Sequence, residues 1–394
     1  MTADTQTGTA ENIKNLSAEL TGWLVGSALP LWATRGIDPE RGACFEAISL
    51  ETLQGTGSSC RARVVPRQIY SLLEGSRLGW KGPGRDLACA LLDWYLDTYL
   101  TEDGFFAAEA DLSGTVTDPR FDLYNQAFSL FGFAQIASAV PERKEMAARN
   151  ARTLLTRLME THRHAEAGFL EGAPDRLPLR SNPHMHLFEA CLAWETVSGD
   201  VFWNQLADEI AELALTRFID PVSGGLREFF NADWTPFDAD EGRVMEPGHQ
   251  FEWAWLLIRW GSARKDAGAL VAARRLYDIG WTYGIDENRG VTFMALNDDF
   301  AVRDPLARLW GQTEWLKAAV ALAEVSGGPE RDAYLSDIAD ASAALRTYLD
   351  SAPDGLWRDK LDSRGRFADE PAPASSLYHI VCAIAELDAF ANTL

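Results

Sequence analysis

Apolar residues recur at three- and four-residue steps along almost the whole chain, in segments of helical length. Pro141, Asp200, Asp304 and Ser375 stand where four of these segments are expected to begin, because proline and small polar residues favour the first turn of a helix. Strand-like runs are few and short. The pattern predicts an all-α protein, with helices near residues 12–33, 66–79, 85–100, 121–140, 142–162, 184–198, 201–218, 248–263, 266–283, 304–325, 329–350 and 375–392.

A second, longer repeat lies between the helices. A turn glycine followed by an apolar residue, with an acidic residue close by, returns every 57 to 65 residues. Each copy follows an odd-numbered helix and precedes an even-numbered one, so two helices and a hairpin-like loop form one unit that occurs six times. The six glycines are Gly42, Gly104, Gly168, Gly225, Gly290 and Gly355.

The two helix classes differ in polarity. Helices before the glycine loops are amphipathic, as in 142–162, whereas those after the loops are apolar almost all round, as in 251–260 and 377–384. A helix that is apolar on every face must be buried on every face. We therefore expect one domain over residues 1–394, an (α/α)6 barrel with six inner and six outer helices. A linear α-solenoid is the alternative, but it would need polar end caps that the terminal repeats lack.

Polar or aromatic residues stand near the start of each even-numbered helix, again 57 to 65 residues apart. If these helices line the bore, the residues converge at one of its ends. Burial of so many polar groups is costly unless they pair with one another or with a ligand, so they mark a candidate site. They are Arg67, Tyr124, Asn182, His186, His249, Glu252, Trp310, Glu314 and His379.

Each histidine also has a purely structural interpretation. His379 lies among apolar neighbours, as a hydrogen-bonded core histidine would, and His249 follows Pro-Gly, as a helix cap would. His249 and Glu252 are three residues apart on one helix face, where the carboxylate can orient the imidazole. His184 and His186 are two residues apart and point to different sides of a helix, so no metal site is expected. His162 and His164 end a charged helix, where cations suit the helix dipole.

Composition narrows the class of partner. Lys+Arg 36 against Asp+Glu 58 give a net charge of −22, which disfavours nucleic acids and anionic membranes. Five scattered cysteines without a C-x-x-C motif indicate reduced thiols. No basic stretch followed by an apolar one marks a signal peptide, and no apolar run is long enough to span a membrane. We expect a cytoplasmic monomer or homodimer. The glycine-rich segment 55–61 lacks the lysine of a phosphate loop and is expected to be a mobile cover over the bore.

Six stretches resemble the N-acylglucosamine 2-epimerase family, which includes cellobiose 2-epimerases and bacterial mannose isomerases. The similarity runs from about Trp23 to Phe390. It implies an (α/α)6 barrel that epimerises sugars or interconverts aldoses and ketoses, with no metal or redox cofactor. The stretches are RVVPRQIYSL, LYNQAFSLFG, NPHMHLFEA, EPGHQFEWAWLL, LWGQTEWLKA and SSLYHI.

The resemblance also implies roles for single residues. His249 and His379 resemble the acid/base pair of the family, and Arg67 the arginine near the reacting oxygens. Pro66, directly before Arg67, departs from the family pattern. The remaining roles are substrate binding for Asn182 and His186, support of the first catalytic histidine for Glu252, and pocket walls for Tyr124, Trp310 and Glu314.

These residues suit proton transfer at a sugar carbon. A histidine with a pKa near its ordinary value of about 6.5 exchanges protons readily at neutral pH, and the cis-enediolate so formed needs a positive charge such as that of Arg67. We expect His379 to be the base at C2, with His249 serving ring opening and reprotonation. The stretches QIYSL and EPGHQFEWAWLL resemble the mannose isomerase branch of the family, and this resemblance favours aldose–ketose isomerisation of the mannose/fructose type.

The alternative within the family is 2-epimerisation, of the mannose/glucose, N-acylglucosamine or cellobiose type. No phosphate loop or basic cluster is evident, so an unphosphorylated monosaccharide is the expected substrate. Two other classes stay open. A glycoside hydrolase would use two carboxylates such as Glu252 and Asp118, and a non-catalytic scaffold would use the concave face of the repeats.

Overall fold

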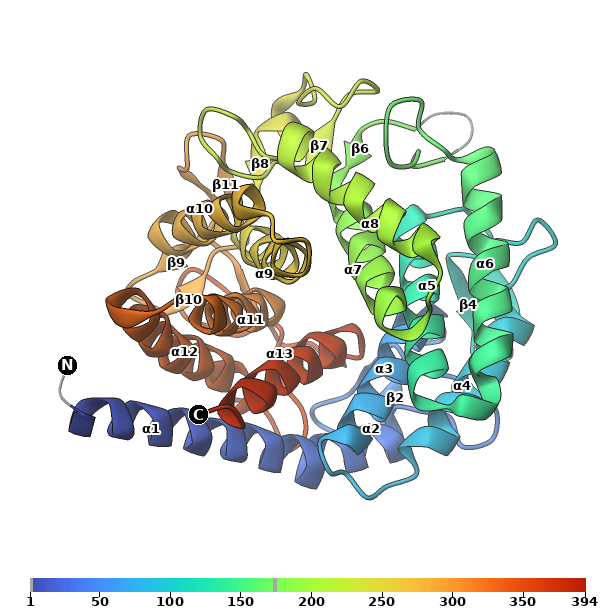
Figure 1. Cartoon of the computed structure of the whole chain (residues 1–394). Coiled ribbons are helices and arrows are strands. Elements are labelled where there is room, and N and C mark those ends of the chain that lie inside the picture. Colours follow the sequence, from blue (N-terminus) through green and yellow to red (C-terminus); the bar gives the residue numbers. More distant parts are fainter. Residues whose placement is uncertain (1–2, 173–175) are drawn as a thin grey trace.

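The computed structural model describes residues 3–172 and 176–394, and its helices form two concentric rings (Figure 1). Each inner helix contacts the next along the chain, and α13 packs back against α3, so the inner ring closes. Closure confirms the (α/α)6 barrel and excludes the linear solenoid. The inner helices are α3 (Val64–Arg77), α5 (Leu123–Ala139), α7 (Ser181–Val197), α9 (Pro247–Arg264), α11 (Leu309–Val325) and α13 (Ser375–Ala391).

The outer ring consists of the amphipathic helices, with one helix beside each inner one. In α6 the buried residues all lie on one side, whereas in α9 every residue from Pro247 to Ile258 is buried. This contrast is what the polarity of the sequence predicts. The outer helices are α1 (Ala3–Trp23) with its continuation α2 (Leu29–Arg35) beyond a π-helical turn, α4 (Gly84–Tyr99), α6 (Lys144–Thr161), α8 (Val201–Leu213), α10 (Ala267–Gly284) and α12 (Gly328–Leu349).

Three of the four expected helix starts are confirmed. Asp200 caps α8 by accepting a hydrogen bond from the Phe202 amide at 3.1 Å, Ser375 begins α13, and Pro141 begins the 3-10 turn that leads into α6. The start at Asp304 is wrong. Its side chain caps a turn by accepting from the Leu306 amide, but Pro305 disfavours helix at this point and α11 begins only at Leu309.

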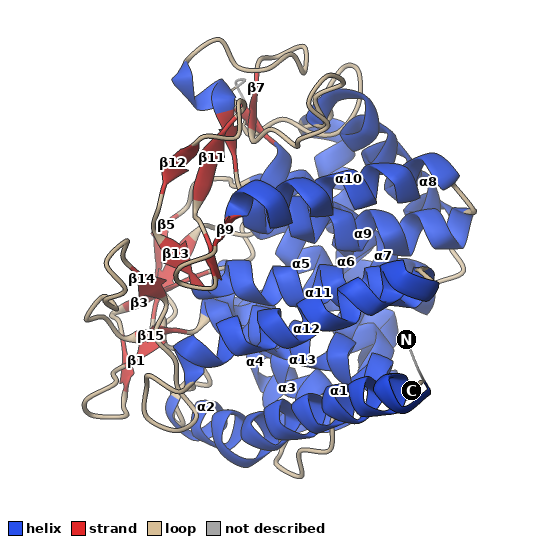
Figure 2. Ribbon diagram, turned by 90° about the vertical axis from the view of Figure 1, so that its left-hand side faces the viewer, coloured by secondary structure: helices blue, strands red, loops and turns tan. Residues whose placement is uncertain are grey.

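Short antiparallel strands gather at one end of the barrel, the end at which the inner helices begin (Figure 2). Segment 55–61, expected as a mobile cover, forms two of these strands. The strands are β1 (Ala47–Ile48), β2 (Gly55–Thr56), β3 (Ser59–Arg61), β4 (Glu109–Asp111), β5 (Val116–Asp118), β6 (Leu179–Arg180), β7 (Phe229–Phe230), β8 (Val244–Met245), β9 (Ile285–Asp286), β10 (Val291–Thr292), β11 (Ala295–Asn297), β12 (Val302–Asp304), β13 (Ala307–Arg308), β14 (Lys360–Leu361) and β15 (Ala372–Pro373). They pair as β15-β1-β2, β3-β4-β5, β6-β7, β12-β11-β8, β10-β9 and β13-β14.

The repeated glycines make the turn from each outer helix into this strand end. The turn glycines have φ between 65° and 85°, a conformation that glycine adopts without steric cost. In the fourth repeat the turn residue is Gly224, with φ 76°, and not Gly225 as predicted. A Cβ on Gly225 would instead lie 2.7 Å from Met245 Sδ, so this second glycine permits a close approach.

Buried glutamines fasten the turns to the inner helices. Gln250, in the first turn of α9, accepts from the Leu226 amide and donates to its carbonyl, both at 2.8 Å. Gln126 does the same for Phe106, and Gln312 accepts from the Thr292 amide. Each of these partners lies two residues beyond a turn glycine. The start of the inner helix, where the candidate residues stand, is thereby held in a fixed position relative to its loop.

Two further expectations concern the whole chain. The five cysteines carry free thiols; Cys44, Cys60, Cys191 and Cys382 are buried and Cys89 is half-buried. Among the described helices, none has both the length and the apolar character that crossing a bilayer requires.

Candidate active site

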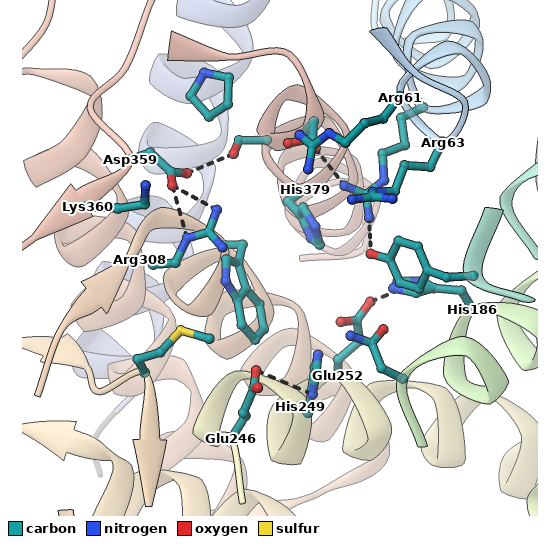
Figure 3. A pocket seen from close by; sticks show the side chains of 18 of the residues that line it. Arg61, Arg63, His186, Glu246, His249, Glu252, Arg308, Asp359, Lys360 and His379 are labelled. Carbon is teal, nitrogen blue, oxygen red and sulfur yellow. Dashed lines mark hydrogen bonds and ion pairs between the residues drawn. The ribbon is translucent and has the colours of Figure 1, made fainter. Parts of the chain in front are cut away.

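A cavity of about 580 Å³ opens at the strand end of the barrel axis. Figure 3 shows side chains from several inner helices converging on it. The predicted residues reach it because each stands in the first two turns of an inner helix. Its wall contains Arg67, Tyr124, Asn182, His186, His249, Glu252, Trp310 and His379. Glu314 is the one predicted residue that is absent from this wall.

His249 stands in the first turn of α9 against two carboxylates. Its Nδ1 lies 3.0 Å from Glu228 Oε2 and 3.6 Å from Glu246 Oε2. Burial by itself lowers the pKa of His249, but Glu228 and then Glu246 outweigh it and raise the pKa to about 10. His249 is therefore an imidazolium at neutral pH and can donate a proton into the cavity.

His379, in the second turn of α13, has the opposite character. Its Nδ1 lies 2.8 Å from Glu314 Oε1. Burial, together with the nearby charges of Arg67 and Lys317, holds its pKa well below the ordinary value. With Nδ1–H donating to Glu314, the lone pair of Nε2 is free to accept a proton.

Trp310 lies between the two histidines. Its indole centroid is 5.0 Å from the ring of His249 and 6.1 Å from that of His379. One cavity therefore holds a charged and a neutral imidazole against the same aromatic wall. Two titratable groups whose environments drive their pKa values apart are the usual arrangement of an acid and a base.

Glu252 and Glu314 differ from their predicted places. Glu252 Oε1 lies 4.0 Å from His186 Nδ1 and 3.8 Å from Lys317 Nζ, so the carboxylates directly against His249 are Glu228 and Glu246 instead. Glu314 lies beneath the cavity, where it contacts His379. An i,i+3 spacing puts two residues on one helix face but does not decide which neighbouring helix each side chain meets.

Lys317 is a functional candidate that sequence reasoning missed. It is wholly buried, its Nζ lies 2.5 Å from Glu314 Oε2, and it stands 3.9 Å from the ring centroid of Trp255. Burial and then Glu252 hold the pKa of Glu314 well above its ordinary value, although the Lys317 ammonium opposes the rise. The signal was available, because a lysine inside an apolar helix is rarely buried unless it is paired.

Two buried donor sets have the spacing of metal ligands. They are His186 with Glu189 and Glu252, and Glu252 with Glu314 and His379. Glu252 belongs to both sets and Glu314 to the second, and both face the Lys317 ammonium. That ammonium supplies positive charge at the position where a cation would bind the second set.

Arg67 is the deepest cation of the wall. It donates to the Tyr124 hydroxyl and, at 3.2 Å, to the Ser375 carbonyl, while its Nε has no hydrogen-bond partner among the described residues. Pro66 stands in the first turn of α3, where proline is tolerated, so the departure from the family pattern does not displace Arg67. Asn182 Oδ1, at the start of α7, also lacks a partner within the described part of the chain.

The remaining histidines belong to the core. His184 uses both ring nitrogens on backbone, at Arg180 O and Phe169 N, and burial lowers its pKa to about 4. His164 contacts the Ala232 carbonyl and His162 stacks on Phe121. The hydrolase alternative loses its carboxylate pair, because Asp118 ends β5 beside Arg120 and lines a different cavity from Glu252.

The structure also assembles a cluster of cations that the sequence did not reveal. These residues come from four separate segments and meet at the mouth of the cavity, so no local run of basic residues announces them. They are Arg61, Arg63, Arg180, Arg308 and Lys360. The expectation of an unphosphorylated substrate depended on the lack of such a cluster, so the argument for it no longer holds.

Residues 46–383 match the profile of the N-acylglucosamine 2-epimerase (GlcNAc 2-epimerase) family. The chain belongs to this family. It is 51% identical over 376 residues to the mannose-6-phosphate isomerase of Rhizobium meliloti (strain 1021), covering 94% of this chain and 96% of that protein. It is 28% identical over 281 residues to the D-mannose isomerase of Thermobifida fusca, covering 66% and 67% of the two chains. The family resemblance is thus confirmed, and the protein is a carbohydrate isomerase or epimerase.

Solved structures bear out the fold. A D-mannose isomerase superposes with a TM-score of 0.84 at 19% identity, covering 96% of this chain and 97% of the other. Cellobiose 2-epimerase from Bacillus thermoamylovorans B4167 superposes with a TM-score of 0.83 at 17% identity, covering 96% and 100%.

Proposed function

We propose that this cavity interconverts an aldose and its ketose, of the mannose/fructose type, by moving protons between C1, C2 and their oxygens. The observation that carries the proposal is the pair of buried histidines on one cavity wall, both close to Trp310 and each held by a carboxylate of its own, Glu228 for His249 and Glu314 for His379. The aldose and the ketose are isomers, so the reaction needs no external oxidant or reductant, and we propose that it proceeds without a metal ion or redox cofactor.

Ring opening comes first, because the C2 proton becomes acidic only beside a free carbonyl. The His249 imidazolium donates a proton to the ring oxygen as the C1–O bond to that oxygen breaks. The C1 hydroxyl proton passes to water as the aldehyde forms, and His249 regains a proton from water. Glu228 and Glu246 keep His249 charged for this step. A positioned acid or base of this kind contributes roughly 10²–10⁴-fold in rate.

His379 then takes the proton from C2 through Nε2. The electron pair of the C–H bond forms the C1–C2 double bond and charge collects on the carbonyl oxygen, giving the cis-enediolate. Arg67 lies near His379, its Nε has no hydrogen-bond partner among the residues that the structure describes, and its charge can stabilise the enediolate. Glu314, held by Lys317, keeps the His379 ring oriented while its charge changes.

The product forms when His379 delivers a proton to C1, after the proton held on its Nε2 has exchanged with water. The hydroxyl oxygen on C2 gives up its proton and becomes the ketone oxygen, while the oxygen on C1 takes up a proton and becomes a hydroxyl. A proton delivered instead to the other face of C2 would give the 2-epimer. We favour isomerisation because the sequence relatives are named mannose-6-phosphate isomerase and D-mannose isomerase. Those names differ on the phosphate but agree on the chemistry at C1 and C2.

Variants of the two histidines test the mechanism. His249→Gln and His379→Gln should each lower kcat by at least about two orders of magnitude. His162→Gln is the matched control, since His162 lies outside the cavity. Full activity in either cavity variant would refute the assignment.

Product analysis tests the reaction. NMR of the enzyme incubated with mannose or mannose 6-phosphate in deuterated water should show the corresponding fructose compound, with deuterium appearing at its C1. Formation of the glucose compound alone would make the enzyme a 2-epimerase, and no conversion of either sugar would refute the proposal.

A further inference from the structure

A second cavity of about 290 Å³ adjoins the first on the side of β3, β4 and β5. Arg61, Arg63, Asp122 and Arg180 line both cavities, so these four residues stand at the boundary between them. Arg120 and Arg176 also line the second cavity. The chain as a whole carries a net charge of −22, so a group of arginines at the substrate entrance is opposite in sign to the rest of the molecule.

Three of these cations follow one line from the reacting carbons outward. Arg67 is buried in the first turn of α3, the Arg63 side chain is 22% exposed, and the Arg61 side chain is 39% exposed. Arg63 precedes Arg67 by four residues in helical conformation, which places it about 6 Å nearer the mouth. Figure 3 shows Arg61 and Arg63 together above His379.

Most of the surrounding arginines already have carboxylate partners. Arg61 pairs with Glu46 at 2.6 Å, and Arg120 pairs with Asp118 at 2.6 Å. Arg180 pairs with both Glu171, at 2.6 Å, and Asp122, at 3.1 Å. The remaining carboxylate of the second cavity, that of Glu109, accepts from the Ser59 hydroxyl.

Arg63 and Arg67 are the exceptions. The nearest carboxylate oxygen to Arg63, on Asp122, is 4.0 Å away, and Asp122 is engaged by Arg180. Arg67 has no carboxylate partner among the described residues. Burial, and the neighbouring charges of Arg61 and Arg67, lower the pKa of Arg63, as expected where cations crowd together without enough anions.

We infer that Arg63, assisted by Arg61, binds a phosphate group at the end of the sugar remote from the reacting carbons, so that the preferred substrate is a hexose 6-phosphate. This inference rests on the proposed function. A phosphate ester carries about −1.5 to −2 charges at neutral pH, and guanidinium groups bind it through paired N–H donors. The outward step from Arg67 to Arg63, roughly one helical turn, matches the span from C2 to the far end of an open hexose.

The kcat/KM values for mannose 6-phosphate and for mannose test the phosphate subsite at Arg63. The wild-type enzyme should convert mannose 6-phosphate with a kcat/KM at least roughly tenfold higher than that for mannose, the usual size of one charge-assisted hydrogen bond. Arg63→Met should lower kcat/KM for the phosphate by roughly tenfold to a hundredfold more than for mannose. For Arg63→Lys, kcat/KM for mannose 6-phosphate should lie between those of the wild type and Arg63→Met, because lysine keeps the charge but lacks the paired N–H donors of the guanidinium.

Arg85→Met is the matched control. It removes the same charge from an exposed ion pair with Glu142 on an outer helix, so the ratio of the two kcat/KM values should stay that of the wild type. Equal losses on both sugars in Arg63→Met, or a wild-type preference for mannose, would overturn the subsite and leave the proposed reaction intact. Failure to convert either sugar would overturn the proposed reaction itself.

Discussion

Glu228→Gln removes the carboxylate that lies directly against His249. The wild-type pair joins Nδ1 and Oε2 at 3.0 Å, and Glu228 also accepts from the Ser181 hydroxyl at 2.9 Å. Glutamine keeps the shape and an acceptor oxygen for both partners. The substitution therefore changes the charge beside His249 with little change in packing.

The size of the effect follows from the spacing. Two unit charges 3.0 Å apart attract by about 5 kcal/mol at an effective dielectric constant of about 20. The rise in the His249 pKa from 6.5 to about 10 is worth a similar amount, about 5 kcal/mol, after burial has been overcome. Loss of Glu228 should thus lower this pKa by roughly two to four units, with Glu246 left to supply the rest.

The dependence of kcat/KM on pH measures that change. His249 must be protonated to act as the acid, so the wild-type activity should fall only as the pH rises through about 10. In Glu228→Gln the fall should begin roughly two to four units lower. The free energy of unfolding should also fall at high pH. Because the pKa of His249 is raised on folding, its contribution to stability is complete below about pH 6.5 and is lost as the pH rises through about 10.

Glu142→Gln, a surface substitution in an exposed ion pair, is the matched control and should leave the basic limb unchanged. A basic limb that stays in place in Glu228→Gln would refute the assignment of His249 as an acid whose charge Glu228 maintains. Activity in the wild type that rises as His249 loses its proton would refute it as well.

Three further substitutions or treatments address other parts of the site. Lys317→Met should destabilise the fold by roughly 3–5 kcal/mol, because it removes the buried ammonium that faces Glu314 and Glu252. The double variant Lys317→Met/Glu314→Gln should recover most of that loss in thermal unfolding; no recovery would show that the pair is not coupled. Gly248→Ala should cost roughly 1–3 kcal/mol in chemical denaturation and raise KM, because its Cβ would lie 2.2 Å from Trp310 Cζ3; an unchanged KM would place the indole outside the binding wall. Dialysis against EDTA should leave kcat unchanged; a loss that Zn²⁺ or Mn²⁺ restores would assign a catalytic metal to His186, Glu189 and Glu252.

The fold was accessible from the sequence because two physical signals agreed. The near absence of charge in segments such as 251–260 and 377–384 requires burial on all sides, and the repeated glycine marks a turn that few other residues can adopt. The same repeat located eight of the nine candidate residues on the cavity wall, since equivalent helix starts must meet at one end of a closed ring.

The partners of those residues were not accessible in the same way. Glu228 meets His249 from the loop that precedes α9, and Lys317 of α11 faces Glu252 of α9, so these contacts depend on how a loop and a neighbouring helix pack. Arg61 and Arg63 lie in a short strand and a helix cap whose direction no periodicity specifies. The wrong start at Asp304 has a similar cause, because a capping aspartate serves a turn as well as a helix.

The protonation states of the two histidines can be read directly by ¹⁵N NMR of the imidazole rings, with His249→Gln and His379→Gln to assign the signals. At pH 7.5 the ring of His249 should be charged and that of His379 neutral, and His379 should not titrate as the pH falls through its ordinary pKa of about 6.5. A neutral His249 at pH 7.5, or a His379 that titrates near its ordinary pKa, would contradict the division of acid and base between them.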